Sequence, residues 1–229
     1  MSKGTDISSR WAPGGAIDQA INSLRGGEPV LVHDAADREG EVDLIYHAAS
    51  VVPNAVTRLR NDAGGLICVA LGHEIADAFD LPFLADEIDH PAVSNEELGY
   101  GERSSFSLTV NHRDTYTGIT DDDRSTTIRA IGDLAATPTA TDFAAEFRVP
   151  GHVHLLRGAP GLLAQRKGHT ELGLSLARAA SLSPAVVVCE MLDDETGNAL
   201  APINARAYAD EHEVPYIEGR LIVDYFGLD

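Results

Sequence analysis

The sequence contains little lysine and little positive charge of any kind. Its only lysines are Lys3 and Lys167, and 17 Lys+Arg residues stand against 36 Asp+Glu residues, so the 229-residue chain has a formal net charge of -19. A nucleic-acid backbone must be met by a basic surface, so this balance argues against nucleic acid as a partner. Acid excess with few lysines also suggests a halophile-like protein kept soluble in a salty cytoplasm, where ions screen the repulsion between surface carboxylates.

Cysteine is scarce as well, and long hydrophobic runs are missing. Cys68 and Cys189 lie in the separate apolar runs "GGLICVAL" and "AVVVCEM", with no C-x-x-C spacing. We expect both to be reduced and buried. No stretch approaches the roughly 20 apolar residues of a membrane span, and the first residues hold no apolar signal-peptide core. These features predict a cytoplasmic protein with no membrane partner.

The chain has no visible linker. Gly and Pro are scattered, no segment has low complexity, no period of 20–50 residues repeats, and 44% of the residues are hydrophobic. This composition can bury a substantial core. We therefore expect a single domain over residues 1–229.

Apolar periodicity predicts strands that alternate with helices. The expected strands are 29–35, 42–49, 65–71, 105–111, 152–158, 185–191 and 214–217, and the expected helices are 14–27, 53–63, 170–181 and 202–212 with a final helix after the last strand. Strands joined by helices predict an α/β fold (α+β in some schemes), a three-layer α-β-α sandwich with a mixed, largely buried sheet. The acidic segment 84–103 has little periodicity and is a candidate mobile loop.

Two acidic runs invite a metal-site interpretation. In "DREGEVD", residues 37–43, four carboxylates and Arg38 lie on the connection between two expected strands, either as a solvated acidic turn or as a metal site. In "TDDDR", Thr120 and Asp123 have the spacing of a capping box, and carboxylates in a first helical turn are favoured by the helix dipole. For this second run we therefore favour the structural interpretation.

Other polar residues interrupt the apolar pattern in the second half of the chain. Taken singly, His152 is explained as a surface histidine, and His154, which alternates with apolar residues, as a hydrogen-bonded strand residue. "RKGHTE", residues 166–171, is either a plain helix start with Thr170 as N-cap and Glu171 in the first turn, or an anion site. Glu190 ends the run "AVVVC" at a strand edge, where open α/β sheets usually place ligands.

A family resemblance decides between these alternatives. The segments "HDAADREGEVDLIYHAA", "DAGGLICVAL", "TGITDDDRSTTI", "PGHVHLLRG", "RKGHTELGLSLARAA" and "VVVCEMLDDETGNALAP" together resemble 3,4-dihydroxy-2-butanone 4-phosphate synthase, in order from about residue 17 to residue 226. The resemblance implies conversion of D-ribulose 5-phosphate to L-3,4-dihydroxy-2-butanone 4-phosphate and formate in riboflavin biosynthesis. It also implies two Mg²⁺ or Mn²⁺ ions per active site, and a homodimer with active sites at the subunit interface. The cysteine cluster of a fused GTP cyclohydrolase II domain is absent from the sequence.

The same resemblance implies a role for each matching residue. Glu39 and His169 match the metal ligands, while His152 and Glu190 match the residues essential for catalysis. The positions that match substrate contacts are Arg38, Glu39, Asp43, Arg166, Lys167, Gly168, His169, Thr170 and Glu190. We expect Glu41 to act as an acid/base, Asp37 only to position Arg38, and Cys68 to be a buried apolar residue that could also line the site.

The implied chemistry explains these residue types. Abstraction of the C3 proton of a 2-ketose makes an enediolate, which requires a Lewis acid and a positioned base. The later steps, dehydration, skeletal rearrangement and expulsion of formate, require control of water, for which the segment 84–103 or the Arg38 loop is a candidate lid. Two alternatives stay open at this level: another sugar-phosphate enzyme such as a metal-dependent isomerase or aldolase, and a non-catalytic module that binds a phosphorylated ligand.

Overall fold

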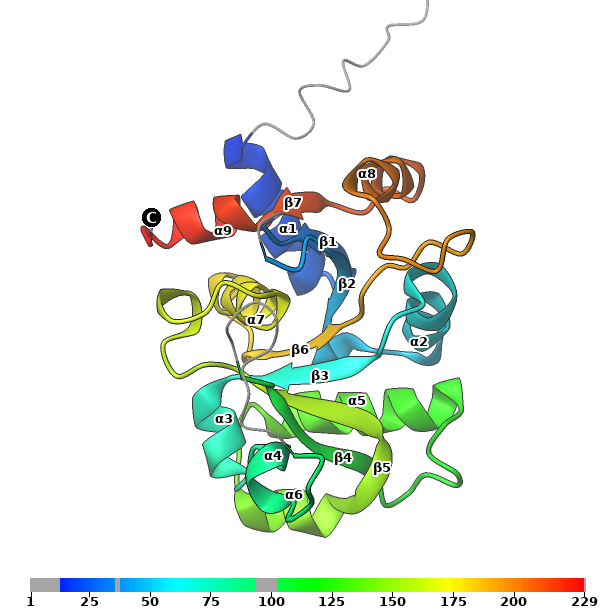
Figure 1. Cartoon of the computed structure of the whole chain (residues 1–229), viewed down its shortest axis with the longest axis vertical. Helices are drawn as coiled ribbons and strands as arrows, with labels where there is room; N and C mark the ends of the chain where they lie inside the picture. The colour runs from blue at the N-terminus through cyan, green and yellow to red at the C-terminus, as the bar shows by residue number, and fades with distance from the viewer. Residues whose placement is uncertain (1–12, 36–37, 94–102, 229) are drawn as a thin grey trace, which may run out of the picture.

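Seven strands form one mixed sheet in the order β4-β5-β3-β6-β2-β1-β7 (Figure 1). The computed structural model describes residues 13–35, 38–93 and 103–228. The strands are β1 (Val30–His33), β2 (Val42–His47), β3 (Cys68–Leu71), β4 (Phe106–His112), β5 (Phe147–Arg157), β6 (Ala185–Val188) and β7 (Tyr216–Glu218). The pairs β1–β7 and β3–β5 are parallel, and the other neighbouring pairs are antiparallel.

Helices cover both faces of this sheet. They are α1 (Pro13–Arg25), α2 (Pro53–Arg58), α3 (His73–Ala78), α4 (Leu84–Glu87), α5 (Asp121–Leu134), α6 (Ala140–Glu146), α7 (His169–Ala179), α8 (Pro202–Glu211) and α9 (Gly219–Tyr225). One apolar cluster joins α1, α7 and α9 to one face of the sheet, and a second joins α2, α3, α5, α6 and α8 to the other (Figure 1). The predicted three-layer α-β-α sandwich is confirmed.

The central strands are buried on both faces, which explains their nearly unbroken apolar sequence. In β1, Leu31 belongs to the second cluster, whereas Val30 and Val32 belong to the first, because successive side chains point to opposite faces. Each of these three residues is fully buried. The sheet is therefore a rigid base, and the loops at the ends of its strands are free to carry polar groups.

Two local predictions need correction, and one helix was not predicted. A strand was expected at 152–158, but β5 begins at Phe147 and the pairing shifts register between Val110 and Asn111. Such an irregularity accommodates Pro150, which cannot donate to a regular ladder. Thr170 is not an N-cap, because α7 begins at His169 after Gly168. The helix α6, capped by Thr139, was not predicted.

The N-cap half of the predicted capping box is confirmed. Thr120 Oγ1 accepts a hydrogen bond from Asp123 N at 3.1 Å, as expected for the N-terminus of α5. The Asp123 carboxylate in turn accepts hydrogen bonds from the backbone N–H groups of Tyr116, Thr117 and Gly118. This aspartate thus organises the loop that precedes α5.

The two cysteines are free and buried, as predicted. Within the described ranges, none of the helices combines the length and the apolar character needed to cross a bilayer. Of the acidic segment proposed as a mobile loop, residues 84–87 form α4, and 94–102 lie outside the described residues together with Asp37.

Candidate active site

Four separate segments bring polar side chains to one end of the sheet. The loop from β1 to β2 carries Asp34 and Glu39, β2 carries Asp43, the first turn of α7 carries His169, and Glu190 follows β6. Antiparallel pairing places β2 between β1 and β6, and Asp43 forms an isolated bridge with Glu190. The hairpin loop and the end of β6 therefore meet beside the start of α7.

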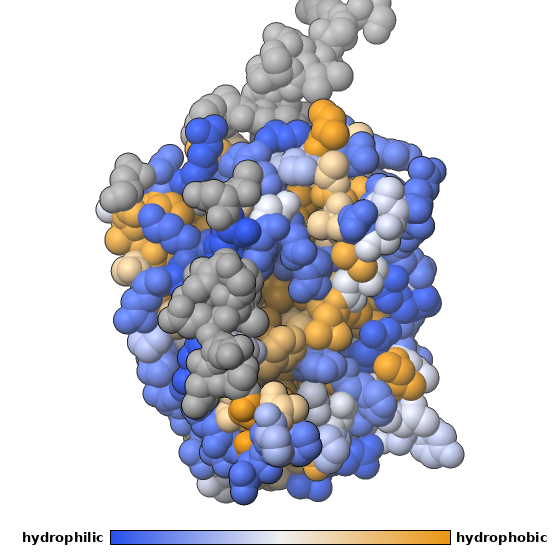
Figure 2. All heavy atoms as spheres, viewed as in Figure 1, coloured by the Kyte–Doolittle hydropathy of each residue, from blue (hydrophilic) through white to orange (hydrophobic). Residues whose placement is uncertain are grey.

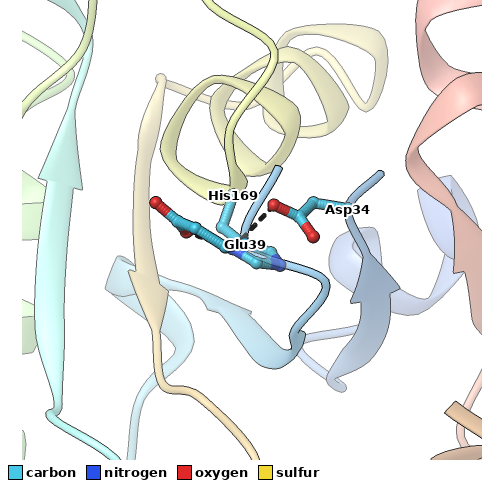
Figure 3. A group of neighbouring side chains, drawn as sticks. All are labelled: Asp34, Glu39 and His169. Atoms are coloured by element: carbon cyan, nitrogen blue, oxygen red, sulfur yellow. Dashed lines mark hydrogen bonds and ion pairs between the residues drawn. The ribbon is translucent and has the colours of Figure 1, made fainter. Parts of the chain in front are cut away.

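His169 is the centre of this group (Figure 3). Its Nδ1 lies 3.3 Å from Glu39 Oε2 and 3.9 Å from Asp34 Oδ2. Its Nε2 lies 3.1 Å from the Glu41 carbonyl oxygen and 3.6 Å from Asp43 Oδ1. A carbonyl oxygen only accepts hydrogen bonds, so Nε2–H donates to Glu41, and Nδ1 is turned toward the two carboxylates.

Burial makes the protonation of this group unusual. Burial, aided by the charges of Glu190 and Glu41, raises the pKa of Asp43 to about 7 against the opposing charge of His169. Burial by itself would lower the pKa of His169, but the carboxylates of Asp43, Glu39 and Asp34 raise it to about 10. Burial and the charge of Glu190 also raise the pKa of Glu41. In the absence of a cation, His169 therefore holds a proton that balances the surrounding acid.

The arrangement fits a divalent cation. Ligand atoms of Asp34, Glu39 and His169 all lie within 4.8 Å of one another. Asp43 Oδ1 is buried, lies 3.6 Å from His169 Nε2 and accepts no hydrogen bond among the described residues, so an acceptor with room for a ligand lies beside this group. Carboxylate oxygens with one imidazole suit a hard or borderline cation such as Mg²⁺ or Mn²⁺.

Asp34 was missed in the sequence. It ends the apolar run "PVLVHD" like an ordinary polar residue after a strand, and only its position before the acidic loop could have drawn attention to it. In the structure it is buried, and it accepts hydrogen bonds from Arg38 Nη1 at 3.2 Å and from Glu41 N at 3.1 Å. Asp34 therefore shapes the loop as well as facing His169.

Arg38 is packed over Gly168. Its Nη1 lies 3.2 Å from both Asp34 Oδ2 and Glu39 Oε2. A Cβ atom at position 168 would lie 2.7–2.8 Å from the Arg38 guanidinium group. A side chain at position 168 would therefore displace the Arg38 guanidinium group from the start of α7.

Arg166 is held from two sides. Its Nη1 donates to Ser105 Oγ at 2.9 Å and to Glu171 Oε2 at 3.3 Å. Glu171 is fully buried and also accepts from the Ala159 backbone N–H at 3.0 Å. The sequence indicated only a first-turn glutamate at this position, so its pairing with Arg166 was missed.

Glu39, Asp43, Arg166, His169 and Glu190 border a common cavity of about 130 Å³. Its lining consists of Glu39, Asp43, Cys68, Ser104, Ser105, Phe106, Leu156, Arg166, His169, Thr170, Val188 and Glu190. A larger groove of about 550 Å³ lies between α1 and the segment 212–215 that follows α8. The smaller cavity, however, contains Asp43, whose pKa is strongly raised, and strongly shifted pKa values are typical of functional sites. Cys68 is both buried and part of the lining.

The side chains of two residues assigned to the site line other cavities. Lys167 lines a separate pocket beside α9, and its Nζ donates to the Leu228 carbonyl oxygen at 3.0 Å. His152 is exposed and lines a different cavity of about 290 Å³. Within this chain, His152 therefore does not share the cavity of Glu39 and His169.

The segment 64–67 separates the His152 cavity from Glu190. Gly65 N donates to the Glu190 carbonyl oxygen at 3.0 Å, and Leu66 N donates to Glu190 Oε2 at 2.9 Å. The same segment lines the cavity that contains His152 and His154. Glu190 thus lines the cavity of Glu39 and His169, and it is hydrogen-bonded to backbone that lines the His152 cavity.

Comparison with known proteins agrees with this geometry. The family model described as 3,4-dihydroxy-2-butanone 4-phosphate synthase matches residues 18–225. Proteins of that name from Archaeoglobus fulgidus and Methanosarcina mazei are 45% and 44% identical to this chain, and the alignments cover 92% and 93% of this chain and 93% and 91% of the relatives. A solved structure of a 3,4-dihydroxy-2-butanone 4-phosphate synthase in complex with two magnesium ions is 28% identical, has a TM-score of 0.79, and is matched over 92% of this chain and 95% of its own.

The family match covers the segments that build the cavity, and the solved relative has the same fold over nearly the whole chain. The resemblance seen in the sequence is confirmed by both. This chain belongs to the 3,4-dihydroxy-2-butanone 4-phosphate synthase family of riboflavin biosynthesis.

Proposed function

We propose that the protein is a lyase that converts D-ribulose 5-phosphate to L-3,4-dihydroxy-2-butanone 4-phosphate and formate. The observation that carries this proposal is the meeting of Glu39, Asp43, His169, Glu190 and Arg166 in one cavity. Conversion of a ketose phosphate needs a base, a stabiliser of negative charge and an anchor for phosphate, and this cavity holds candidates for all three.

Glu39 and His169, with Asp34 beside them, are the residues that would hold a divalent cation, and we propose two Mg²⁺ or Mn²⁺ ions per site by analogy with the relative that binds two magnesium ions. When bound, the cation would act as a Lewis acid toward the ketose oxygens and stabilise the negative charge of an enediolate. Because His169 otherwise holds a proton, its Nδ1 must lose that proton before it serves as a ligand.

Within one copy of the chain, we assign the acid–base work to carboxylates. The pKa of Asp43 is raised to about 7 by burial, so this group can accept a proton and return it near neutral pH. Glu41, whose pKa is also raised by burial, is a second candidate. Glu190 is held in place by the Leu66 N–H, which fixes its carboxylate at the cavity.

The phosphate would bind at the start of α7. Free backbone N–H groups at a helix N-terminus attract anions, and Arg166 adds a positive charge beside the first turn, while Thr170 adds a hydroxyl group. Glu171 and Ser105 hold Arg166 in this position. Lys167 is directed to Leu228 instead, so we assign the main cationic contact to Arg166.

A second copy of the chain would supply what one chain lacks. Because His152 lies outside the cavity of Glu39 and His169, we propose a homodimer in which His152 of one copy reaches the site of the other. The His152 cavity is also lined by Leu66 and Ile119, which are 41% and 51% exposed. Figure 2 shows apolar side chains gathered in the middle of one face of the molecule, as expected for a surface that another protein covers.

The test is formate release from ribulose 5-phosphate with magnesium in molar salt. Folded wild-type protein should release formate, whereas Glu39→Ala and His169→Ala should release at least about 10²-fold less. Glu211→Ala, which removes an exposed carboxylate at the end of α8, is the matched control and should be fully active. Folded wild-type protein that releases no formate would refute the proposal, and an isomerised sugar phosphate as the sole product would favour the sugar-phosphate isomerase alternative.

A further inference from the structure

Asn111 on β4 contacts His152 on β5 through both atoms of its amide group. Asn111 is 5% exposed. Its Oδ1 accepts a hydrogen bond from the His152 backbone N–H at 2.8 Å, and its Nδ2 lies 3.1 Å from His152 Nδ1. The other amide contact, from Oδ1 to Nδ1, is longer, at 3.3 Å. A buried amide therefore holds both the backbone and the ring of this exposed histidine.

Two neighbours fix the orientation of the amide. The backbone N–H of His152 is only a donor, so it must face Oδ1. The carbonyl oxygen of Thr117 is only an acceptor, and it lies 3.5 Å from the opposite atom, Nδ2. With Nδ2 donating toward the ring, His152 Nδ1 is an acceptor and carries no proton. The single proton of the neutral ring is then on Nε2, at the far side of the ring from Asn111.

The loop before α5 holds Asn111 in place. Gly118 lies so close to the Asn111 amide that a Cβ atom at this position would collide with it, and its φ of +92° is one that glycine tolerates. Asp123 Oδ2 accepts from Thr117 N at 3.1 Å and from Gly118 N at 2.8 Å, and so fixes the loop against Asn111. The capping aspartate is thus linked to His152 through the loop and Asn111.

The charged groups around His152 do not supply an alternative partner for Nδ1 among the described contacts. Arg60, Arg124 and His154 line the same cavity, and both arginines are paired with Asp121 at 3.0 and 3.2 Å. His112, which follows Asn111, faces Asp114 and Glu146 instead. Asn111 is therefore the group that selects the tautomer of His152.

We propose that Asn111 is a positioning residue that holds His152 as the Nε2–H tautomer, with its proton presented away from the amide and ready for transfer to a substrate. This proposal deepens the proposed function, because it rests on the proposed homodimer, in which His152 of one copy reaches the site of the other. It also assigns a task to the "TGITDDDR" segment beyond helix capping, since that segment fixes the loop that holds Asn111.

The first test is the side-chain ¹⁵N spectrum of the histidines in the full-length protein without substrate. The spectrum is recorded above the ordinary imidazole pKa of about 6.5, and His152 is assigned by the loss of its signals in His152→Gln. In wild-type protein, Nδ1 of His152 should give the shift of an unprotonated nitrogen. In Asn111→Asp, the carboxylate has no N–H to donate, so Nδ1 should become protonated. A protonated Nδ1 in wild type, or an unprotonated Nδ1 in Asn111→Asp, would overturn the assignment.

The second test is the kinetics of the same variants. Asn111→Asp should lower kcat for formate release at least about 10²-fold and change KM less than about threefold, because the proton is misplaced while binding is kept. Asn204→Asp adds the same charge at an exposed position of α8 and should change neither constant. A normal kcat in a folded Asn111→Asp with protonated Nδ1 would refute the positioning role. Failure of wild type to form formate would refute the proposed function instead, while the ¹⁵N spectrum would still decide where the proton lies.

Discussion

Gly65 lies so close to the backbone of Glu190 that a single added methyl group should damage the site. A Cβ atom at position 65 would lie 2.5 Å from Glu190 Oε2 and 2.6 Å from the Glu190 carbonyl oxygen. The carboxylate can rotate away, but the carbonyl oxygen belongs to bridged backbone and cannot. Overpacking of this kind costs about 1–3 kcal/mol, and weakening the bonds from Gly65 N and Leu66 N costs about 1 kcal/mol more.

Gly65→Ala should therefore lower the free energy of unfolding by about 2–4 kcal/mol. For a domain of this size that corresponds to a fall in Tm of about 5–15 °C. Because the displaced group is Glu190, kcat for formate release should fall about 10²-fold as well. Both quantities are measured in molar salt, by thermal unfolding followed by circular dichroism and by the formate assay.

The control is the same substitution at Gly15. This residue lies in α1, and a Cβ atom there would meet no other heavy atom within 4 Å. Alanine is favoured over glycine in a helix by about 0.5–1 kcal/mol, so Gly15→Ala should raise the stability slightly and leave activity unchanged. If Gly65→Ala is as stable and as active as Gly15→Ala, the packing argument is wrong.

Three further predictions concern charge. The pKa of His169 is raised from 6.5 to about 10 and that of Asp43 from 3.8 to about 7, so both favour the protonated folded state. Their stability contributions are complete below the ordinary values and are lost as pH rises through about 7 and then about 10. Urea unfolding of metal-free protein in chelator should show falling stability from about pH 5 to about pH 9, and His169→Gln should flatten this fall; a rise would contradict the assignment. Glu171→Gln should raise KM at least about tenfold and leave kcat within about threefold, because Arg166 loses the carboxylate that orients it, and an unchanged KM in steady-state assays would count against this. The net charge of -19 predicts a lower Tm after dialysis from molar to low salt, and equal Tm values would rule out the halophile-like interpretation.

Most of the fold could be predicted because it depends on local patterns. The apolar runs "PVLVH" and "VDLIYHAA" indicated two strands joined by an acidic loop, and the structure has β1 and β2 there. The start of β5 could not be predicted, because Pro150 and Gly151 indicate a turn in sequence. Only pairing with β4, which lies far away in the chain, keeps these residues in a strand.

The site was predictable where residues are recognised by type and incomplete where geometry decides. Glu39 and His169 are 130 residues apart, and the resemblance placed them together, as the structure does. Lys167 is directed away from the cavity because successive residues entering a helix point in different directions. Asp34, Glu171 and Asn111 were missed because each is an ordinary residue in its own segment, and it acquires a role only through a tertiary neighbour.

The pairing of β1 with β7 has a consequence for biosynthesis. His33 and Glu218, which are partners in this parallel pair, are 185 residues apart. At a synthesis rate of about 5–20 residues per second, β1 waits roughly 10–40 s for the strand that covers its outer edge. During that interval the apolar edge of a nascent chain is open to pairing with other chains. The sheet is thus completed only after residues 216–218 have been made, and a truncation before residue 216 would release a chain with an uncovered β1.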